Sequence, residues 1–200
     1  ISCFLNYVPD SREGLADHYN ENIWLSSMGG GIGGYWGHIR SQGQSTSTGN
    51  KTTGVIPFMH VVDSQMLAFN QGSTRRGSYA SYMDISHPEI VEFIEMRKPT
   101  GGDINRKNLN MHHGINIPDK FMKAVTEDLD WDLIDPNSKD VVQTVKARTL
   151  WIKLMETRMQ TGEPYLMFID TVNKHLPKEL KAKGLKVNHS NLCSEITLPT

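Results

Sequence analysis

Short strand-like runs alternate with helical stretches along this chain, and this order constrains the fold more than any other feature. The strand-like runs lie at residues 2–8, 79–85, 109–117 and 165–169, and the helical stretches lie at 12–27, 57–69, 88–97, 119–129 and 147–159. The run from Tyr165 to Ile169 is apolar at every position, as in strands that a parallel sheet buries on both faces. The alternation therefore predicts an α/β unit with a parallel sheet.

A glycine cluster, Gly29-Gly30-Gly31-Ile32-Gly33-Gly34, follows the first helical stretch, and polar loops follow at 41–54 and 70–77. Three of these glycines satisfy the Gly-x-Gly-x-x-Gly pattern of dinucleotide-binding loops. That pattern needs a strand before it, whereas here a helix precedes it. The run Gly49-Asn50-Lys51-Thr52 also breaks the phosphate-binding loop pattern, because Asn50 separates glycine from lysine. We therefore predict neither kind of site.

Charge and hydropathy argue against several classes of protein. The 200 residues include 21 basic and 22 acidic side chains with no block of one sign, so we expect no nucleic-acid partner. No apolar run approaches the roughly 20 residues of a membrane span and no signal segment opens the chain, so we expect a cytoplasmic location without a membrane partner. The two cysteines form neither a disulfide framework nor a metal-binding spacing, and we predict no metal site.

Both ends of the chain lack the dispensable surface segments at which domains usually begin and end. The sequence runs from Ile1 directly into a strand-like segment and stops at Thr200 just after another apolar run. It contains no internal repeat and no linker. Residues 1–200 are therefore predicted to be one unit, cut from or split out of a longer protein.

The segment with the most reactive side chains is His189-Ser190-Asn191-Leu192-Cys193-Ser194-Glu195-Ile196. If it is extended, Asn191, Cys193 and Glu195 share one face. One interpretation is a polar strand edge with an inert cysteine, and another is a cysteine hydrolase with His189 as the base. A neighbouring carboxylate disfavours a thiolate nucleophile, whereas hydrogen-atom transfer from a neutral thiol tolerates it.

The six residues Asn191-Leu192-Cys193-Ser194-Glu195-Ile196 resemble the Asn-Leu-Cys-x-Glu-Ile signature of ribonucleotide reductase large subunits, of class I more than of the cobalamin-dependent class. Other segments match in family order. Ser2-Cys3 resembles the family's first barrel strand, Gly30-Gly31-Ile32-Gly33 its glycine-rich turn, and residues 70–77 its substrate-specificity loop. Gly162-x-Pro164-Tyr165 follows in the same order, so the resemblance covers the whole chain.

The resemblance implies a role for each reactive side chain in the reduction of ribonucleotides to deoxyribonucleotides. Cys193 would become the thiyl radical that takes the 3′-hydrogen of the substrate. Glu195 would act as the base at the 3′-hydroxyl, and Asn191 would hydrogen-bond the ribose. Cys3 would be one of two redox-active thiols that supply the reducing electrons.

Further residues would bind nucleotides. Ser2, Gly30 and Gly31 would face the substrate, the glycines because bare backbone can approach it closely. Asp10 and Arg40, which are unremarkable by themselves, would bind a deoxynucleotide effector near a dimer interface. In the specificity loop, basic and amide groups would relay effector identity to the substrate base; these are Gln71, Arg75 and Arg76.

The fold implied by the resemblance is a ten-stranded α/β barrel made of two five-stranded halves, with the radical cysteine on a loop that enters the barrel. Residues 1–200 would supply about one half and the start of that finger loop. The family's second reducing cysteine, later phosphate-binding loop, radical-relay tyrosines and carboxy-terminal cysteines do not occur in this sequence, which would therefore contain about half an active site.

The resemblance also implies partners. A metal-containing small subunit would supply the radical, so this chain would need no cofactor of its own, and ATP or deoxynucleoside triphosphates would act as allosteric effectors. A second large subunit, the remainder of the large subunit, and thioredoxin or glutaredoxin would complete the enzyme. Two alternatives stay open at this point: a non-catalytic nucleotide-binding regulator of the same fold, and the cysteine hydrolase.

Overall fold

The computed structural model describes residues 2–69 and 76–200, which alternate between strands and helices over most of their length. In chain order the elements are β1 (Cys3–Tyr7), α1 (Arg12–Ser27), β2 (Gly31–Tyr35), α2 (Val55–Ala68), β3 (Ser78–Asp84), α3 (Ile90–Glu95), a 3-10 turn (Ile104–Arg106), β4 (His112–Asn116), α4 (Asp119–Glu127), β5 (Asp130–Ile134), β6 (Val141–Lys146), α5 (Ala147–Thr161), β7 (Tyr165–Met167), α6 (Ile169–Lys174) and α7 (Lys178–Ala182).

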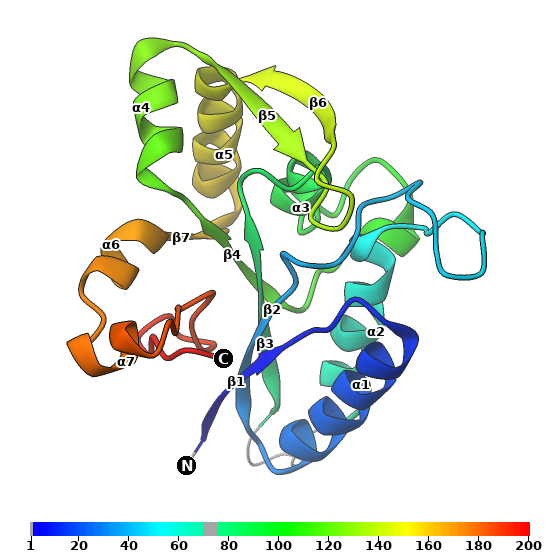
Figure 1. Ribbon diagram of the computed structural model, residues 1–200. Helices are drawn as coiled ribbons and strands as arrows, with labels where there is room; N and C mark the ends of the chain where they lie inside the picture. The colour runs from blue at the N-terminus through cyan, green and yellow to red at the C-terminus, as the bar shows by residue number, and fades with distance from the viewer. Residues whose placement is uncertain (1, 70–75) are drawn as a thin grey trace.

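Five of the strands form one parallel sheet in the order β1-β2-β3-β4-β7 (Figure 1). Each strand returns to the sheet through at least one helix, as parallel pairing requires. The predicted α/β unit with a parallel sheet is confirmed, and the sheet has the five strands expected of one half of the barrel.

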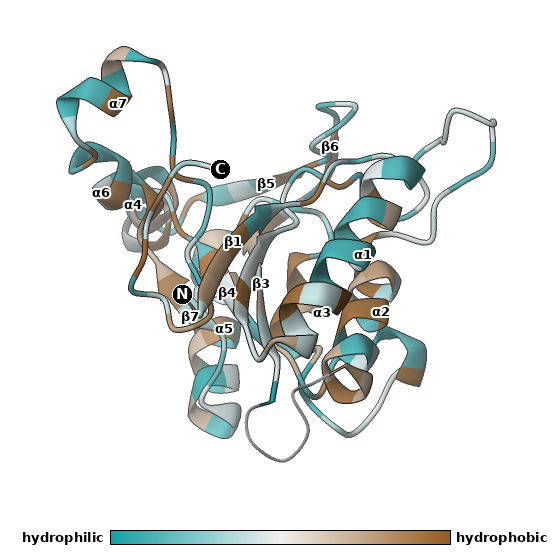
Figure 2. Cartoon of the chain, turned by 90° about the horizontal axis from the view of Figure 1, so that it is seen from below, coloured by the Kyte–Doolittle hydropathy of each residue, from teal (hydrophilic) through white to brown (hydrophobic). Residues whose placement is uncertain are grey.

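One face of the sheet packs against helices. Ile32, Tyr79, Met83 and Ile115 point to this outer face, and each is fully buried. They belong to the main apolar core together with residues of α2, α3, α4 and α5. Figures 1 and 2 both place α1, α2 and α3 on this side of the strands. The outer face therefore accounts for most of the buried apolar surface that drives folding.

The opposite, inner face is covered in part by the carboxy-terminal segment of the chain. Alternate residues of the same strands point here, among them Tyr35, Ala80, Tyr82 and Met167. They form a smaller apolar cluster with residues from α6 to Leu192. In Figure 2 this segment, with α6 and α7, lies on the side of the sheet away from α1 and α2.

The glycine-rich run is a buried strand and not the turn that the resemblance implied. β2 pairs with β1 on one side and β3 on the other, and all five of its residues are buried. A β-carbon at Gly33 would lie 2.0 Å from the backbone oxygen of Ser190, and one at Gly34 would lie 1.7 Å from the hydroxyl of Tyr79. Gly33 lets Ser190 approach the strand on the inner face, and Gly34 lets Tyr79 approach it on the outer face. Neither glycine needs a turn conformation.

The β5–β6 hairpin was not expected from the sequence. The predicted helix at 119–129 ends earlier, because Asp128 adopts a left-handed conformation and β5 begins at Asp130. Residues of β5 alternate between exposed and buried, and Trp131 packs edge-on against Phe121 of α4. All of β6 except Val145 is exposed, and its sequence lacks the alternation of apolar and polar residues that indicates a half-buried strand.

Other boundaries differ by a few residues. α3 is shorter than the predicted 88–97, and β7 ends at Met167 because α6 begins two residues later. α5 ends at Gly162 in a left-handed conformation, as predicted. No helix among residues 2–69 and 76–200 is long and apolar enough to cross a membrane.

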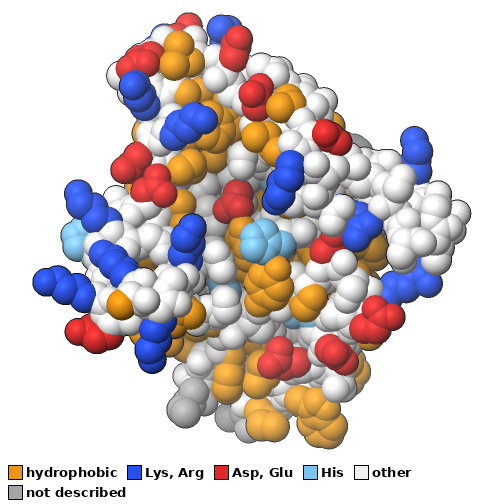
Figure 3. Space-filling view, in the orientation of Figure 1, with side chains coloured by type: hydrophobic (Ala, Val, Ile, Leu, Met, Phe, Trp, Pro, Cys, Tyr) orange, Lys and Arg blue, Asp and Glu red, His pale blue; other side chains and the backbone are white. Residues whose placement is uncertain are grey.

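Positive charge is less evenly spread in space than along the sequence. Lys and Arg side chains gather over α6 and α7 in Figure 3. The segment from the end of α6 to residue 186 has five exposed lysines, Lys174, Lys178, Lys181, Lys183 and Lys186. These lysines are exposed on the surface of the segment and by themselves assign no site.

Candidate active site and effector pocket

The segment with the reactive cysteine is a tight turn and not an extended strand. The side-chain oxygen of Asn191 accepts hydrogen bonds from the backbone N–H of Glu195 at 3.0 Å and of Ile196 at 2.9 Å. Ser194 closes the turn with φ of 63° and an N–H bond to the Asn191 carbonyl. The condition of an extended segment is therefore not met, because the asparagine side chain offers the backbone N–H groups an alternative acceptor.

The turn separates residues that the alternation placed on one face. Asn191 is fully buried, whereas Cys193 and Glu195 are exposed. The amide therefore fixes the turn from inside, and the thiol and carboxylate project from it. This arrangement cannot be predicted from the order of the residues along the chain. It depends on the Asn191 side chain, which accepts hydrogen bonds from the backbone four and five residues further on.

Cys3 and Glu195 meet across the inner face although they are 192 positions apart in the sequence. The sulfur of Cys3 lies 4.0 Å from Oε1 of Glu195. Tyr165, on the edge strand β7, lies close to the same groups: burial and the charge of Glu163 raise the pKa of its phenol, and negative charge on Cys193 and Glu195 adds to this effect. Two thiols, a carboxylate and a phenol thus surround one region of the inner face.

The buried amide of Asn191 is only half satisfied. Its oxygen accepts two backbone N–H groups and a bond from the Ser190 hydroxyl, while its nitrogen has no hydrogen-bond partner among the described residues. A buried amide N–H without an acceptor is costly. A ligand hydroxyl that reached it would remove this cost.

The substrate-facing residues implied by the resemblance lie at the start of β1 and β2. The backbone oxygen of Ser2 accepts the N–H of Gly31 at 2.7 Å, and a β-carbon at Gly31 would lie 3.0 Å from the Leu192 side chain. A β-carbon at Gly30 would instead point toward the Leu25 carbonyl and the Phe4 ring, on the outer side. Gly30 can therefore offer the inner face only its backbone.

His189 is not placed to act as a catalytic base. Its ring is fully buried and stacks on Tyr35, Nε2 bonds the Gly33 carbonyl at 3.1 Å, and Nδ1 lies 3.4 Å from the Thr200 hydroxyl. Burial lowers the pKa of His189 to about 4. Both ring nitrogens are engaged with other groups and the ring is held neutral, which disfavours a cysteine hydrolase with His189 as the base.

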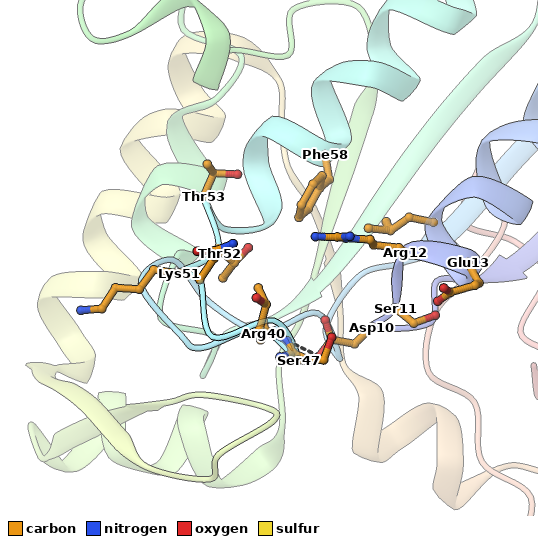
Figure 4. Close-up of a pocket in the computed structure, with 13 residues that line it drawn as sticks. Asp10, Ser11, Arg12, Glu13, Arg40, Ser47, Lys51, Thr52, Thr53 and Phe58 are labelled. Carbon is orange, nitrogen blue, oxygen red and sulfur yellow. Dashed lines mark hydrogen bonds and ion pairs between the residues drawn. The ribbon is translucent and has the colours of Figure 1, made fainter.

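A second polar region lies where β1 ends and where the chain leaves β2. Nε of Arg40 donates to a carboxylate oxygen of Asp10 at 2.9 Å, and Nη1 of Arg40 donates to the Ser45 carbonyl at 2.6 Å. The pair lines a pocket of about 510 Å³ (Figure 4). This volume lies within the usual range for small-molecule sites.

The rest of the pocket comes from the start of α1, the 46–53 loop and the start of α2. Ser11 caps α1 by accepting the N–H of Gly14 at 2.9 Å, so Asp10 is free of capping and pairs with Arg40 instead. In Figure 4 the side chains of Arg12 and Phe58 point toward one another across the pocket, whereas Lys51 points away from the Asp10–Arg40 pair. A helix amino terminus with basic side chains favours an anionic ligand.

Comparison with known proteins agrees with this geometry. The family model described as "Ribonucleotide reductase, barrel domain" matches residues 1–200.

The chain belongs to this family.

Three relatives bear names of the same enzyme. The chain is 59% identical over its whole length to a protein of Frog virus 3 (isolate Goorha) with the provisional name ribonucleoside-diphosphate reductase large subunit. It is 48% identical over 96% of its length to the ribonucleoside-diphosphate reductase large subunit of Invertebrate iridescent virus 6. It is 33% identical over 98% of its length to the ribonucleoside-diphosphate reductase subunit alpha of Helicobacter pylori (strain J99 / ATCC 700824). The chain spans 34%, 20% and 27% of the lengths of these relatives.

The predicted specificity loop lies partly outside the residues that the structure describes. Gln71 and Arg75 lie outside the described residues, and Arg76 is exposed just before β3. Among the residues that the structure describes, no group of three or more His, Cys, Asp or Glu side chains is arranged to hold a metal ion.

Two side chains of this reductase segment have roles that sequence reasoning did not identify. The hydroxyl of Tyr82 donates to the Asn191 carbonyl at 2.7 Å, beneath the reactive turn. Glu163 is a buried carboxylate that binds His112 and His113; burial alone would raise its pKa, but those hydrogen bonds hold the pKa of Glu163 below its usual range. Neither residue belongs to a recognisable motif, so only the fold reveals its partners.

Proposed function

We propose that this chain provides one half of the active site of a class I ribonucleoside-diphosphate reductase, with Cys193 as the thiyl radical. The observation that carries the proposal is the approach of Cys3 to Glu195, which lies two residues after Cys193 in the same turn, with Cys3 sulfur 4.0 Å from the Glu195 carboxylate. The names of the relatives support diphosphates as the substrates.

The proposed chemistry divides the work among the grouped side chains. The Cys193 thiyl radical takes the hydrogen atom from C3′ of the ribose, and Glu195 takes the 3′-hydroxyl proton. The 2′-hydroxyl leaves as water after Cys3 protonates it. Cys3 and a second thiol supply two electrons and become a disulfide, and Cys193 then returns its hydrogen atom to C3′. The partnerless Asn191 amide supports a hydrogen bond to the ribose.

The Asp10–Arg40 pocket is proposed as the effector site. Its volume, its basic side chains and the amino terminus of α1 suit the ribose and phosphates of a deoxynucleoside triphosphate or ATP. Arg76, with Gln71 and Arg75, would connect this site to the substrate base. Coupling of this kind requires that effector and substrate each favour the same loop conformation.

The complete enzyme would include partners that this chain does not contain. We propose a radical-generating small subunit with a metal centre, a second large subunit, the remaining large-subunit barrel, and thioredoxin or glutaredoxin as the reductant. Because the proposed chemistry needs Cys3 and Cys193 as reduced thiols at the start of each turnover, we place the enzyme in the cytoplasm, which for a virus is that of its host.

Conversion of labelled ribonucleoside diphosphate to deoxyribonucleotide tests this function. The assembled enzyme, with small subunit, effector and a dithiol, should show multiple turnovers. Cys193→Ser should abolish them while nucleotide binding persists, because the O–H bond is too strong for the same hydrogen transfer and the volume hardly changes. Reduction above background by Cys193→Ser would remove Cys193 from the radical role, and an inactive wild-type assembly would contradict the function itself.

A further inference from the structure

The turn that presents Cys193 is hydrogen-bonded to a buried phenol of the sheet. Tyr82 lies at the middle of β3, is fully buried, and points to the inner face. Its hydroxyl donates to the Asn191 carbonyl at 2.7 Å. Burial raises the pKa of Tyr82 to about 12, and the hydroxyls of Ser194 and Ser190 lie close enough to oppose that shift. The phenol therefore contacts the turn on both sides of Cys193 while remaining a neutral donor.

Two glycines make this arrangement possible. A β-carbon at Gly114 of β4 would lie 2.6 Å from Cε1 of Tyr82, so only a bare position lets the ring lie across the neighbouring strand. A β-carbon at Gly33 of β2 would lie 2.0 Å from the Ser190 oxygen and 2.7 Å from the Asn191 α-carbon. One glycine thus makes room for the tyrosine and the other for the turn.

The turn has its own internal bonds, but these do not tie it to the sheet. The Asn191 side chain bonds Glu195 and Ile196, and the Ser190 hydroxyl donates to the Ile196 carbonyl at 2.7 Å. Such bonds preserve the shape of the turn, and its position relative to the sheet depends on bonds to the strands, such as the one between His189 and the Gly33 carbonyl just before the turn. The Tyr82 bond connects Asn191 directly to β3, two residues before Cys193.

We propose that Tyr82 is a positioning residue that sets the location of Cys193 relative to Cys3 and the substrate, acting through the Asn191 carbonyl. The proposal rests on the function proposed above for Cys193. Hydrogen transfer is sensitive to distance, and a displacement of about 1 Å can cost a hundredfold in rate. Loss of one buried hydroxyl should therefore affect turnover far more than substrate binding.

Tyr82→Phe in the assembled enzyme tests the proposal, with Tyr35→Phe as the matched control. Tyr35 is a buried tyrosine of the adjacent strand β2 on the same face, but its hydroxyl donates to Asp84 at 2.6 Å and not to the turn. Tyr82→Phe should lower kcat on the order of tenfold to a hundredfold with little change in KM. Tyr35→Phe should leave kcat within about twofold, because a lost side-chain bond elsewhere does not move the turn.

A second measurement does not depend on turnover. Iodoacetamide labelling of Cys193, followed by peptide mass spectrometry, should change by roughly three- to tenfold in Tyr82→Phe, because one lost hydrogen bond shifts the distribution between turn positions, and with it the surroundings of the exposed thiol, by about that factor. Tyr35→Phe should label at the wild-type rate. Gly114→Ala, which displaces the Tyr82 ring without removing its hydroxyl, should change labelling and kcat in the same direction as Tyr82→Phe.

The two measurements separate the two proposals. One outcome is that labelling of Cys193 changes in Tyr82→Phe while the wild-type enzyme reduces no ribonucleotide. That outcome would support the positioning role of Tyr82 and contradict the reductase function. An active wild type in which Tyr82→Phe matches Tyr35→Phe in kcat would overturn the positioning role, whatever the labelling rate. Unchanged labelling in both Tyr82→Phe and Gly114→Ala would overturn it as well.

Discussion

The two faces of the five-stranded sheet are built from alternate residues of the same strands, yet they hold their neighbours differently. On the outer face, apolar side chains such as Ile32 and Met83 interlock with helices and are fully buried. On the inner face, Gly31 and Gly33 bring backbone close to the carboxy-terminal turn, and the contacts are hydrogen bonds from Tyr82 and His189.

This difference separates stability from chemistry. The outer face contributes the apolar burial on which folding depends, at about 25 cal/mol per Å². The inner face buries less apolar surface and instead fixes where Cys3, Asn191 and Glu195 lie relative to one another. Substitutions on one face should therefore affect stability and those on the other should affect turnover.

The largest expected contrast is between Cys3→Ser and Ile32→Ala. Cys3→Ser should permit the first hydrogen abstraction but abolish clean multiple-turnover reduction, because an alcohol cannot form a disulfide, and its melting temperature should stay near wild type. Ile32→Ala should lower the free energy of unfolding by about 2–5 kcal/mol, because it leaves a cavity in the core. Thermal unfolding and labelled-substrate assays measure both effects. A Cys3→Ser enzyme that cycles normally would show that Cys3 is not a reducing thiol.

Adjacent glycines of β2 provide a sharper version of the same contrast. Gly34→Ala places a methyl group against Tyr79 on the outer face, and Gly33→Ala places one against Ser190 on the inner face. Overpacking typically costs about 1–3 kcal/mol, and we expect Gly34→Ala to reach at least that range because the Tyr79 ring is fully buried. Gly33→Ala places its methyl group 2.0 Å from the buried Ser190 backbone oxygen, so it should cost a similar amount of stability, and it should in addition lower turnover at least tenfold.

Urea unfolding and turnover assays on the same two preparations decide this prediction. Equal losses of stability and of activity in Gly33→Ala and Gly34→Ala would break the distinction between the faces.

The outer face could be read from the sequence because it follows simple periodicities. The helical stretch at 147–159 predicted α5, and the apolar run at Tyr165 predicted a strand that forms as β7, although it is an edge strand in which Tyr165 and Leu166 are only half-buried. The β5–β6 hairpin was not predicted because the valines of β6, Val141, Val142 and Val145, do not alternate with polar residues as in a half-buried strand. The five-stranded sheet agrees with the half barrel that the family resemblance implied, which periodicity alone could not have specified.

The inner face could not be read in this way. The resemblance identified Cys3, Cys193 and Glu195 by type, and the structure brings Cys3 and Glu195 together. Their arrangement depends on the Asn191 side chain and on Tyr82, which contact residues far away in the chain or bond the backbone of a turn. Alternation along an extended segment would have placed Asn191, Cys193 and Glu195 on one face, but local periodicity cannot detect a side chain that competes for backbone N–H groups.

A smaller effect should appear in the pH dependence of stability, to which each face contributes one histidine. Burial lowers the pKa of His18 on the outer side and of His189 on the inner side to about 4, from 6.5. Between these values the unfolded chain binds protons that the folded chain does not, so the free energy of unfolding falls as pH decreases from about 6.5 to about 4. Each histidine should account for roughly 3 kcal/mol of that loss.

Urea unfolding at pH 7.5 and at pH 4.5 measures this contribution, and His18→Gln and His189→Gln should each reduce the difference between the two pH values. The comparison with wild type cancels other titrating groups that the variants share. If either variant keeps the full wild-type difference, that histidine does not remain neutral in the folded protein.

The smallest expected effect lies outside both faces, in the Asp10–Arg40 pocket. Asp10→Ala and Arg40→Ala should each weaken deoxynucleotide binding by about tenfold or more, because a charge-assisted hydrogen bond contributes roughly 1.5–3 kcal/mol. Basal reduction and thermal stability should change little, since the pair is partly exposed and exposed ion pairs contribute little to folding.

Lys51→Ala is the matched control, because Lys51 lines the same pocket but points away from the pair (Figure 4). Equilibrium binding of a labelled effector at fixed ionic strength measures all three variants, and the effector's influence on substrate choice should weaken with its affinity in the first two. Unchanged affinity in both Asp10→Ala and Arg40→Ala would remove the pair from the effector site, whereas a basal rate that falls with affinity would show that the pocket and the inner face are not separable.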